Sequence, residues 1–269
     1  MLVQKYVDML NQKSVIRTLS EFATARGKEI GYENVFDYSL GNPSVAVPDK
    51  VNQTMIELLQ TKSSMELHGY SQIVDVLSSS VGSLTNCNKV ANTIKSKENI
   101  NISQNTVAAY LDHLEDAFLF SRAKRYDIKG KSYFDYPEKF YIEDIGLRNV
   151  RLGFRQQEET HIMENIIYNE LICRGYSVDV GVVYRYVEKK KVTKEIDFIA
   201  SIGAKKVYIQ SAFAMQNEEK REAELDSLRL TKDSFTKVVI RQDIRKRWVD
   251  DEGILHINLI DFLLDRNAI

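Results

Sequence analysis

The sequence predicts a mixed fold, α+β in its first part and α/β in its second, preceded by a helical arm. Three helix-length apolar patterns followed by two strand-like ones occupy residues 73–142 and predict the α+β part. From residue 145 onward helical and strand-like patterns alternate, which is typical of a mixed sheet flanked by helices. With 269 residues, 43% of them hydrophobic, the chain can hold one large domain or two modest ones.

The bulk composition excludes several classes of protein. The formal net charge is −1, so binding to nucleic acid or to a membrane would need a local basic patch. Cys87 and Cys173 lie far apart and the four histidines lack metal spacing, so neither a disulfide framework nor a zinc site is expected. The first residues do not form a signal-peptide pattern, and no apolar run approaches the ~20 residues of a membrane helix. These features favour a cytoplasmic protein with no membrane partner.

The first 72 residues predict the helical arm. Residues 3–30 are helical in character, with Gly31 as a stop, and a turn-rich segment covers residues 41–49. Pro48 is well placed to open a second helix through residue 59. Residues 60–72, rich in serine, threonine and glycine, predict a linker or loop.

Residues 73–143 have the element order of a winged helix-turn-helix domain. The expected elements are three helices, a strand, a basic turn and a returning strand: 73–81 (stopped by Gly82), 88–97, a helix capped by Ser103, 118–126, 129–131 and 140–142. In the third helix Val107, Leu111 and Leu114 form one apolar stripe, with Phe118 one turn further on.

The winged-helix pattern suggests contacts with DNA. Asn105 and Thr106 lie in the first turn of the third helix, where a recognition helix meets base edges. The following hairpin carries the dense basic cluster of the chain, made of Arg122, Lys124, Arg125, Lys129 and Lys131. However, the acidic residues Asp112, Glu115 and Asp116 would repel DNA along the later turns of the third helix. DNA, a protein partner or a second copy of the chain therefore all stay open as partners.

Residues 144–269 predict the mixed sheet and its flanking helices. The expected helices and strands cover 145–153, 160–174, 177–186, 196–202, 206–212, 217–228, 237–241, 254–257 and 259–264. Five stretches carry a family resemblance: 123–131, Asp144-Ile145-Gly146-Leu147-Arg148, 164–171, Glu195-Ile196-Asp197-Phe198 and Tyr208-Ile209-Gln210. They resemble the PD-(D/E)XK nuclease-like (restriction-endonuclease-like) fold. With the winged helix, they resemble the C-terminal portion of a family of prokaryotic AAA+-type ATP-binding proteins.

The resemblance implies a vestigial nuclease site. Working members hold Mg²⁺ with a helix carboxylate, a strand aspartate and a second strand acid, assisted by a lysine. Glu164 and Asp197 match the first two positions, but Gln210 replaces the second acid and Ala212 the lysine. We therefore expect no hydrolysis and no resident cofactor. Mg²⁺ enters only under the alternative of a divergent nuclease, in which Glu170 or Glu195 would assist.

Residues 1–72 resemble the start of a fold-type I aminotransferase that uses pyridoxal phosphate. The resemblance rests on Phe22-Ala23, the run Ser39 to Ser44, Pro48 and the run Leu67 to Ser71, with Tyr70 matching a phosphate-contacting tyrosine. The Schiff-base lysine would lie in a large domain that the sequence does not contain. An inactive fragment of this type is thus the third alternative.

The phosphate-binding loop motif G-x-x-x-x-G-K-[ST] of ATPases does not occur in the sequence either. The leading interpretation is therefore a non-catalytic module of an ATP-binding protein, without its ATPase domain.

Overall fold

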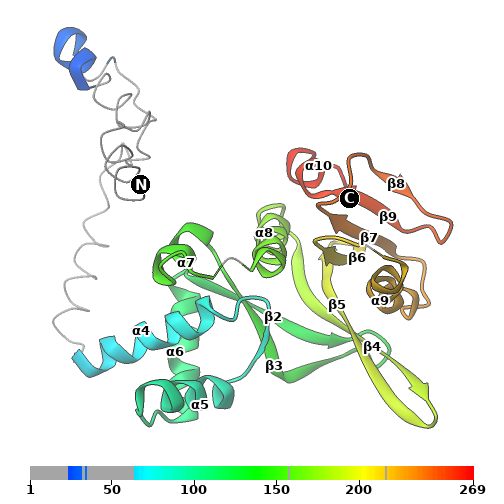
Figure 1. The fold of residues 1–269 in the computed structure, drawn as a ribbon, viewed down its shortest axis with the longest axis horizontal. Helices are drawn as coiled ribbons and strands as arrows, with labels where there is room; N and C mark the ends of the chain where they lie inside the picture. The colour runs from blue at the N-terminus through cyan, green and yellow to red at the C-terminus, as the bar shows by residue number, and fades with distance from the viewer. Residues whose placement is uncertain (1–23, 32–33, 35–63, 157, 216) are drawn as a thin grey trace, which may run out of the picture. The chain divides into compact units, whose positions relative to one another are not determined.

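A computed structural model describes residues 24–31, 34, 64–156, 158–215 and 217–269 (Figure 1). The chain divides into two compact units, Met1–Ser63 and Ser64–Ile269, and each is considered by itself. In the first unit residues 24–30 form a helix. The earlier part of the helix expected at 3–30, the turn-rich segment at 41–49 and the helix expected at 48–59 lie outside the described residues.

The second unit opens with three helices around a short strand. They are α4 (Ser64–Ser78), β1 (Leu84–Thr85), α5 (Cys87–Glu98) and α6 (Gln104–Asp116). The expectation of a linker up to residue 72 was wrong for its last part, because α4 already begins at Ser64. The ring of Tyr70 stacks on Tyr110 of α6 at 3.9 Å, so packing between helices outweighs the local signal of serine and glycine.

The expected cap of the third helix and the expected hairpin are present, and α5 has a cap at Asn86 that was not predicted. The Asn86 and Ser103 side chains accept hydrogen bonds from the first turns of α5 and α6. The hairpin strands are β2 (Phe120–Asp127) and β3 (Ser132–Ile142). Phe118 does not extend the apolar stripe of α6, because its φ is +55° and its side chain is 82% exposed. The helix has ended at Asp116, and the chain turns there in a left-handed conformation.

The strands form one mixed nine-stranded sheet in the order β1-β3-β2-β4-β5-β6-β7-β9-β8. The remaining elements are α7 (Ile145–Arg151), α8 (Glu159–Cys173), β4 (Ser177–Val187), β5 (Lys190–Ile202), β6 (Lys205–Ala212), α9 (Glu218–Arg229), β7 (Thr236–Arg241), β8 (Trp248–Val249), β9 (Leu255–Asn258) and α10 (Leu259–Leu264). The two-residue edge strand β8 had no signal in the sequence pattern. The mixed α/β class is confirmed by this arrangement.

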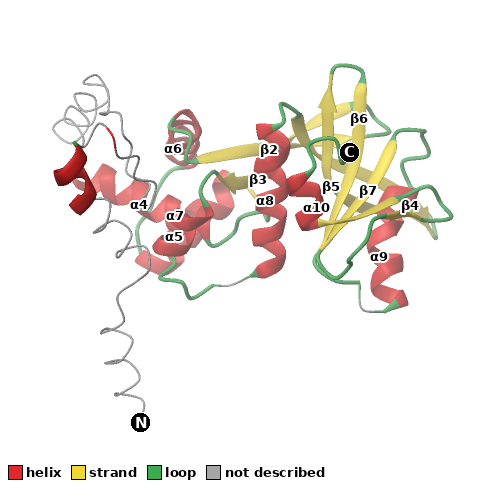
Figure 2. Ribbon diagram, turned by 90° about the horizontal axis from the view of Figure 1, so that it is seen from above, coloured by secondary structure: helices red, strands yellow, loops and turns green. Residues whose placement is uncertain are grey.

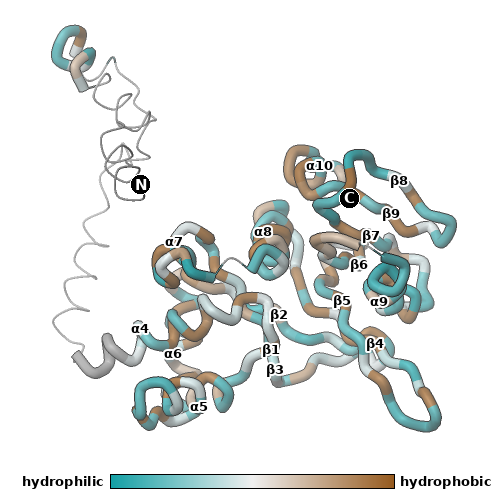
Figure 3. The backbone as a smooth tube through the Cα atoms, viewed as in Figure 1, coloured by the Kyte–Doolittle hydropathy of each residue, from teal (hydrophilic) through white to brown (hydrophobic). Residues whose placement is uncertain are grey.

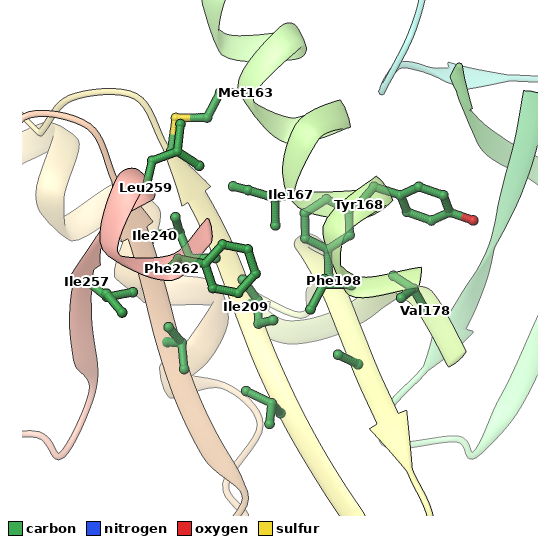
Figure 4. Close-up of a cluster of buried hydrophobic side chains, with 14 of the residues drawn as sticks. Met163, Ile167, Tyr168, Val178, Phe198, Ile209, Ile240, Ile257, Leu259 and Phe262 are labelled. Atoms are coloured by element: carbon green, nitrogen blue, oxygen red, sulfur yellow. The ribbon is translucent and has the colours of Figure 1, made fainter. Parts of the chain in front are cut away.

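Helices cover both faces of the C-terminal strands (Figure 2). On one face, α8 and α10 enclose the larger core, where Ile167 and Phe262 lie against Ile240 (Figure 4). On the other face, Leu225 and Leu228 of α9 pack on the alternate residues of the same strands. The outer surface of α9 is hydrophilic (Figure 3), as expected for a helix with one buried face. No described helix is long and apolar enough to cross a membrane.

The helical layer and the C-terminal strands share this sheet through a short parallel pairing. The pairs between β2 and β4 run from Arg125–Val180 to Asp127–Val182. Toward the other end of β2, its neighbour β3 lies beside α8. Side chains from β3, α8 and β5 meet there.

Candidate functional site

The centre of the site is the ammonium group of Lys139, which lies among three carboxylates. Its Nζ is 2.9 Å from Glu164 Oε1, 2.8 Å from Glu195 Oε1 and 3.7 Å from Asp197 Oδ1. The hydroxyl of Tyr141 donates a second hydrogen bond to Glu164, at 2.7 Å. The lysine and its acids come from β3, α8 and β5, so the cluster joins three elements.

Strand alternation places these side chains. On β3, Lys139 and Tyr141 are two positions apart and point to the same side, while Phe140 and Ile142 pack in the core beneath the helices. On β5, Glu195 and Asp197 share a face in the same way. The α8 helix presents Glu164 next to buried Met163 and Ile167.

Asp197 and Gln210 have additional partners. Asp197 Oδ2 accepts a 2.8 Å hydrogen bond from the backbone N–H of Ser211 on β6. The Gln210 amide donates to Glu224 of α9 at 3.1 Å. Ala212, which the resemblance aligns with the lysine of working nucleases, is buried against α9. The amide at position 210 is thus engaged with α9.

Burial and mutual repulsion dominate the electrostatics of the cluster. Burial, and next the negative charge of Glu164, raise the pKa of Asp197 to about 7, although Lys139 and the Ser211 N–H act in the opposite direction. Burial alone would lower the pKa of Lys139, but the charges of Glu164, Asp197 and Glu195 outweigh it and raise that pKa above its usual range. Burial and the charge of Asp197 also raise the pKa of Glu224. The cluster therefore holds a permanent cation and an excess of acids.

The site is mostly buried, and Glu195, with a side chain 29% exposed, is its most accessible member. The side chains of Lys139, Glu164 and Asp197 are 5%, 11% and 13% exposed. The loop after α4 covers Glu164, since a Cβ atom at Gly82 would lie 3.2 Å from its carboxyl carbon. A phosphodiester has to reach its metal ion to be cleaved, and these side chains offer little surface for that approach.

The residues do not fit a magnesium ion in this arrangement. A divalent cation needs several oxygens at 2.0–2.6 Å around a shared centre (typical values), and here the carboxylates surround Lys139 Nζ instead. Among the described residues, no three His, Cys, Asp or Glu side chains form a group that could hold a metal. A metal would first have to displace the ammonium.

Two expectations about this site need correction. The sequence indicated two acids and no lysine, but Glu195 supplies a third carboxylate and Lys139 a basic group. Lys139 was missed because it comes from β3, far from the Glu195–Asp197 stretch in sequence; the alternation of polar and apolar residues along 139–142 was the available signal. Glu170, the other acid considered, pairs with Arg174 at 2.7 Å instead.

The expected nucleic-acid residues on α6 lie at the surface. Asn105 is exposed and lines a groove between the starts of α5 and α6, together with Asn86 and Gln104. Thr106 is half-buried, and its Oγ1 lies 2.7 Å from Ser103 Oγ within the helix cap. Of this pair, Asn105 is therefore the more accessible side chain.

The five basic residues of the hairpin do not form one patch. Arg122 is paired with Asp112 and Glu115 of α6 and lies 3.9 Å from Glu138. Lys124 and Lys131 are exposed. The guanidinium of Arg125 lies over the Phe134 ring, and the ammonium of Lys129 lies over the Tyr184 ring.

The hairpin tip is also not a free wing. The Ile128 N–H bonds the Val182 carbonyl at 3.1 Å, so the turn docks on β4.

Comparisons with known proteins find matches to two families that are described as domains of unknown function. Residues 57–158 match the DUF8612 model, and residues 159–262 match DUF4143, which is associated with the C-terminal regions of AAA-type ATPases. An uncharacterized protein from Haemophilus influenzae is 34% identical over 235 residues; the alignment covers 83% of this chain and 56% of that protein. The chain thus spans little more than half the length of this relative.

The crystal structure of protein VC1899 from Vibrio cholerae is a distant match, with a TM-score of 0.29 and 14% identity, covering 75% of this chain and 55% of that one. The DUF8612 match begins at residue 57 and so crosses the junction expected near Gln72. The Haemophilus influenzae alignment also extends before Ile73, because residues 73–269 cannot supply 83% of the chain.

Proposed function

We propose that this chain is a non-catalytic, target-binding module that works beside an AAA-type ATPase. The observation that carries the proposal is the position of Lys139 Nζ, within 4 Å of three carboxylates in a mostly buried site. A nuclease of this kind would hold a metal ion between its acids. In this chain the internal ammonium neutralises part of their charge and ties α8 to β3 and β5.

The arrangement of elements supports the two finer assignments. The order α4, β1, α5, α6, β2, β3, with β1 paired to β3, supports the assignment of a winged helix-turn-helix to residues 73–143. The strands β4 to β7 with α8 and α9 have the layers of a PD-(D/E)XK nuclease-like domain over residues 144–269. The association of DUF4143 with AAA-type ATPases supports an ATPase partner. The target is a nucleic acid or a protein.

A cleavage assay tests the non-catalytic part. The full chain is incubated with supercoiled, linear and single-stranded DNA in the presence of Mg²⁺ or Mn²⁺, and metal binding is followed by calorimetry. We expect no product above that of Asp197→Asn and no stoichiometric metal binding. Metal-dependent cleavage that disappears in Asp197→Asn would overturn the proposal.

One observation favours a second candidate, a divergent metal-dependent nuclease. Three carboxylates and a lysine, the residue types of such a site, do converge. In that case Glu164, Glu195 and Asp197 would hold Mg²⁺ after Lys139 moved to the attacking water. Glu195→Gln would then abolish cleavage, whereas in the non-catalytic protein it changes stability alone.

The inactive aminotransferase fragment predicts a different readout. Its decisive residues lie mostly outside the described part of the chain, while Tyr70 lies against Tyr110 and His113 on α6. Pyridoxal phosphate bound as a Schiff base would add an absorbance band to the purified protein. We expect no such band after incubation with the cofactor.

A further inference from the structure

The hairpin of β4 and β5 extends beyond the core as a two-stranded ribbon. Figure 1 shows it projecting from the rest of the sheet, and every residue from Arg185 to Lys191 is exposed. Val187 pairs with Lys190, and the two residues between them, Glu188 and Lys189, have φ values of +50° and +66°. Two left-handed residues make the tight turn that matches the twist of the strands.

The two faces of this ribbon differ. Residues directly opposite each other in antiparallel strands point to the same side. Arg185, with Lys194 on the same side, faces α9, and both lie against Asp226, at 2.9 Å and 3.6 Å. The basic groups of this side are thus already paired with a carboxylate.

The opposite side, here called the tyrosine face, consists of Tyr184, Tyr186, Lys191 and, from the β2–β3 turn, Lys129. The ammonium groups of Lys191 and Lys129 lie 4.0 Å and 4.7 Å from the centroid of the Tyr184 ring. Lys129 Nζ also donates a hydrogen bond to the Tyr184 carbonyl, which fixes it beside the ribbon. Among the described residues, neither ammonium has a carboxylate within ion-pair distance.

Tyr186 completes the tyrosine face as an open aromatic platform. Its ring lies edge-on to Tyr184 at 6.0 Å and opposite Lys191, and its side chain is 67% exposed. Fixed cations next to an exposed aromatic ring are the combination with which proteins bind single strands. The cations attract phosphates, and the ring stacks on an unpaired base, whose face a duplex would cover.

We infer that the tyrosine face binds single-stranded nucleic acid, with phosphates at Lys129 and Lys191 and a base stacked on Tyr186. This inference rests on the proposed target-binding function and names the class of target. Exposed side chains form the whole of the contact, so the ATPase is not needed for it.

Two double variants test the inference in the full chain, and each removes two positive charges, so the net charge of the two proteins is the same. Lys129→Gln with Lys191→Gln removes two charges from the tyrosine face, and Arg185→Gln with Lys194→Gln removes two from the paired face. Fluorescence anisotropy with a labelled oligothymidine of about 20 nucleotides should show at least ~10-fold weaker binding for the first and less than ~3-fold for the second. Equal losses, or no loss in either, would overturn the inference. Melting temperatures check that both variants are folded.

Tyr186 separates single strands from other anionic targets. Tyr186→Ala should weaken oligothymidine binding by ~5- to 100-fold, while Tyr186→Phe keeps it, because the stacking surface is retained. Binding that prefers a duplex of the same length, or that occurs on phosphatidylserine vesicles and not on oligothymidine, contradicts the inference. The cleavage assay is independent of these binding measurements. Failure to bind oligothymidine would leave the non-catalytic proposal intact, and observed cleavage would leave the binding inference intact.

Discussion

Lys139 on β3 donates a 2.9 Å hydrogen bond to Glu164 on α8, and this buried pair connects the helical layer with the C-terminal strands. Both side chains are almost fully covered, so each relies on the other for the solvation that water would provide. This one ion pair thus stabilises the fold. By our proposal, it takes the place of the metal ion that a nuclease would need for catalysis.

Removing the lysine charge should destabilise the fold strongly. Lys139→Met leaves three acids without their cation, and loss of one partner of a buried pair costs ~3–5 kcal/mol. Urea unfolding measures this difference. Lys232→Met, which removes an exposed ammonium, is the control and should change the free energy of unfolding by less than ~0.5 kcal/mol. Comparable changes in the free energy of unfolding for the two substitutions would show that the ion pairs of Lys139 do not stabilise the fold.

The raised pKa of Asp197 makes stability depend on pH. Burial, and next Glu164, raise this pKa to about 7, whereas an unfolded aspartate titrates near ~4. Between these values the folded protein binds a proton that the unfolded chain has lost, so stability falls as pH rises and then levels off.

Asp197→Asn removes that dependence. The variant should gain stability relative to the wild type from about pH 4 to about pH 7, with a slope of at most ~1.4 kcal/mol per pH unit. Urea unfolding over this range measures it, and the exposed Asp251→Asn serves as control. Parallel curves for Asp197→Asn and wild type would contradict the raised pKa.

Asn165 should be another point of high sensitivity. Its side chain is fully buried, accepts a hydrogen bond from the Ile142 N–H at 2.9 Å and donates to the Ile142 carbonyl at 2.8 Å. Asn165→Leu leaves the Ile142 N–H without its side-chain acceptor and the Ile142 carbonyl with Asn169 as its remaining side-chain donor, at a cost of ~1–3 kcal/mol. Asn169→Leu removes donor contacts to the Ile142 and Glu143 carbonyls and the acceptor of Asn165 Nδ2, but leaves the Ile142 N–H paired, so it should cost less in thermal unfolding. The reverse order would refute this account.

Gly181 is required by close packing between strands. A Cβ atom there would lie 2.9 Å from Ile196 Cβ and 3.2 Å from Ile128 Cδ1. Gly181→Ala should therefore destabilise by ~1–3 kcal/mol through overpacking. Gly203→Ala has open space but a φ of +56°, so backbone strain alone should cost ~1 kcal/mol. Chemical denaturation compares the two, and an equal or smaller loss at Gly181 would argue against the packing explanation.

Arg122 and Lys124 should differ in any binding of DNA by the hairpin. The guanidinium of Arg122 is held by acids of α6, whereas Lys124 is exposed. Lys124→Gln should weaken duplex binding by ~2- to 5-fold and reduce its salt dependence, while Arg122→Gln leaves both unchanged. Anisotropy titrations at two salt concentrations measure this. A larger effect at Arg122 would mean that its ion pairs open on binding.

Local signals predicted the positions of most elements. The stripe of Val107, Leu111 and Leu114 identified α6, and Ser103 its cap, because periodicity and capping depend on neighbours in sequence. The start of α4 was missed because Tyr70 is held in a helix by stacking on α6. Phe118 was misplaced because helix periodicity does not show where the chain turns away.

The sequence by itself determined the mixed fold, and its resemblance to the nuclease-like family singled out Glu164 and Asp197, with an amide at Gln210 and a methyl group at Ala212 where that family carries an acid and a lysine. Only the tertiary structure decided that Lys139 and Glu195 join those acids, and that the basic hairpin docks on β4. Strand pairing and the shared burial of opposite charges bring distant residues together, and the alternation within one strand does not show which residues of other elements its side chains will meet. The sequence therefore indicates the acidic residues of the cluster, whereas the lysine between them is identified only from the three-dimensional structure.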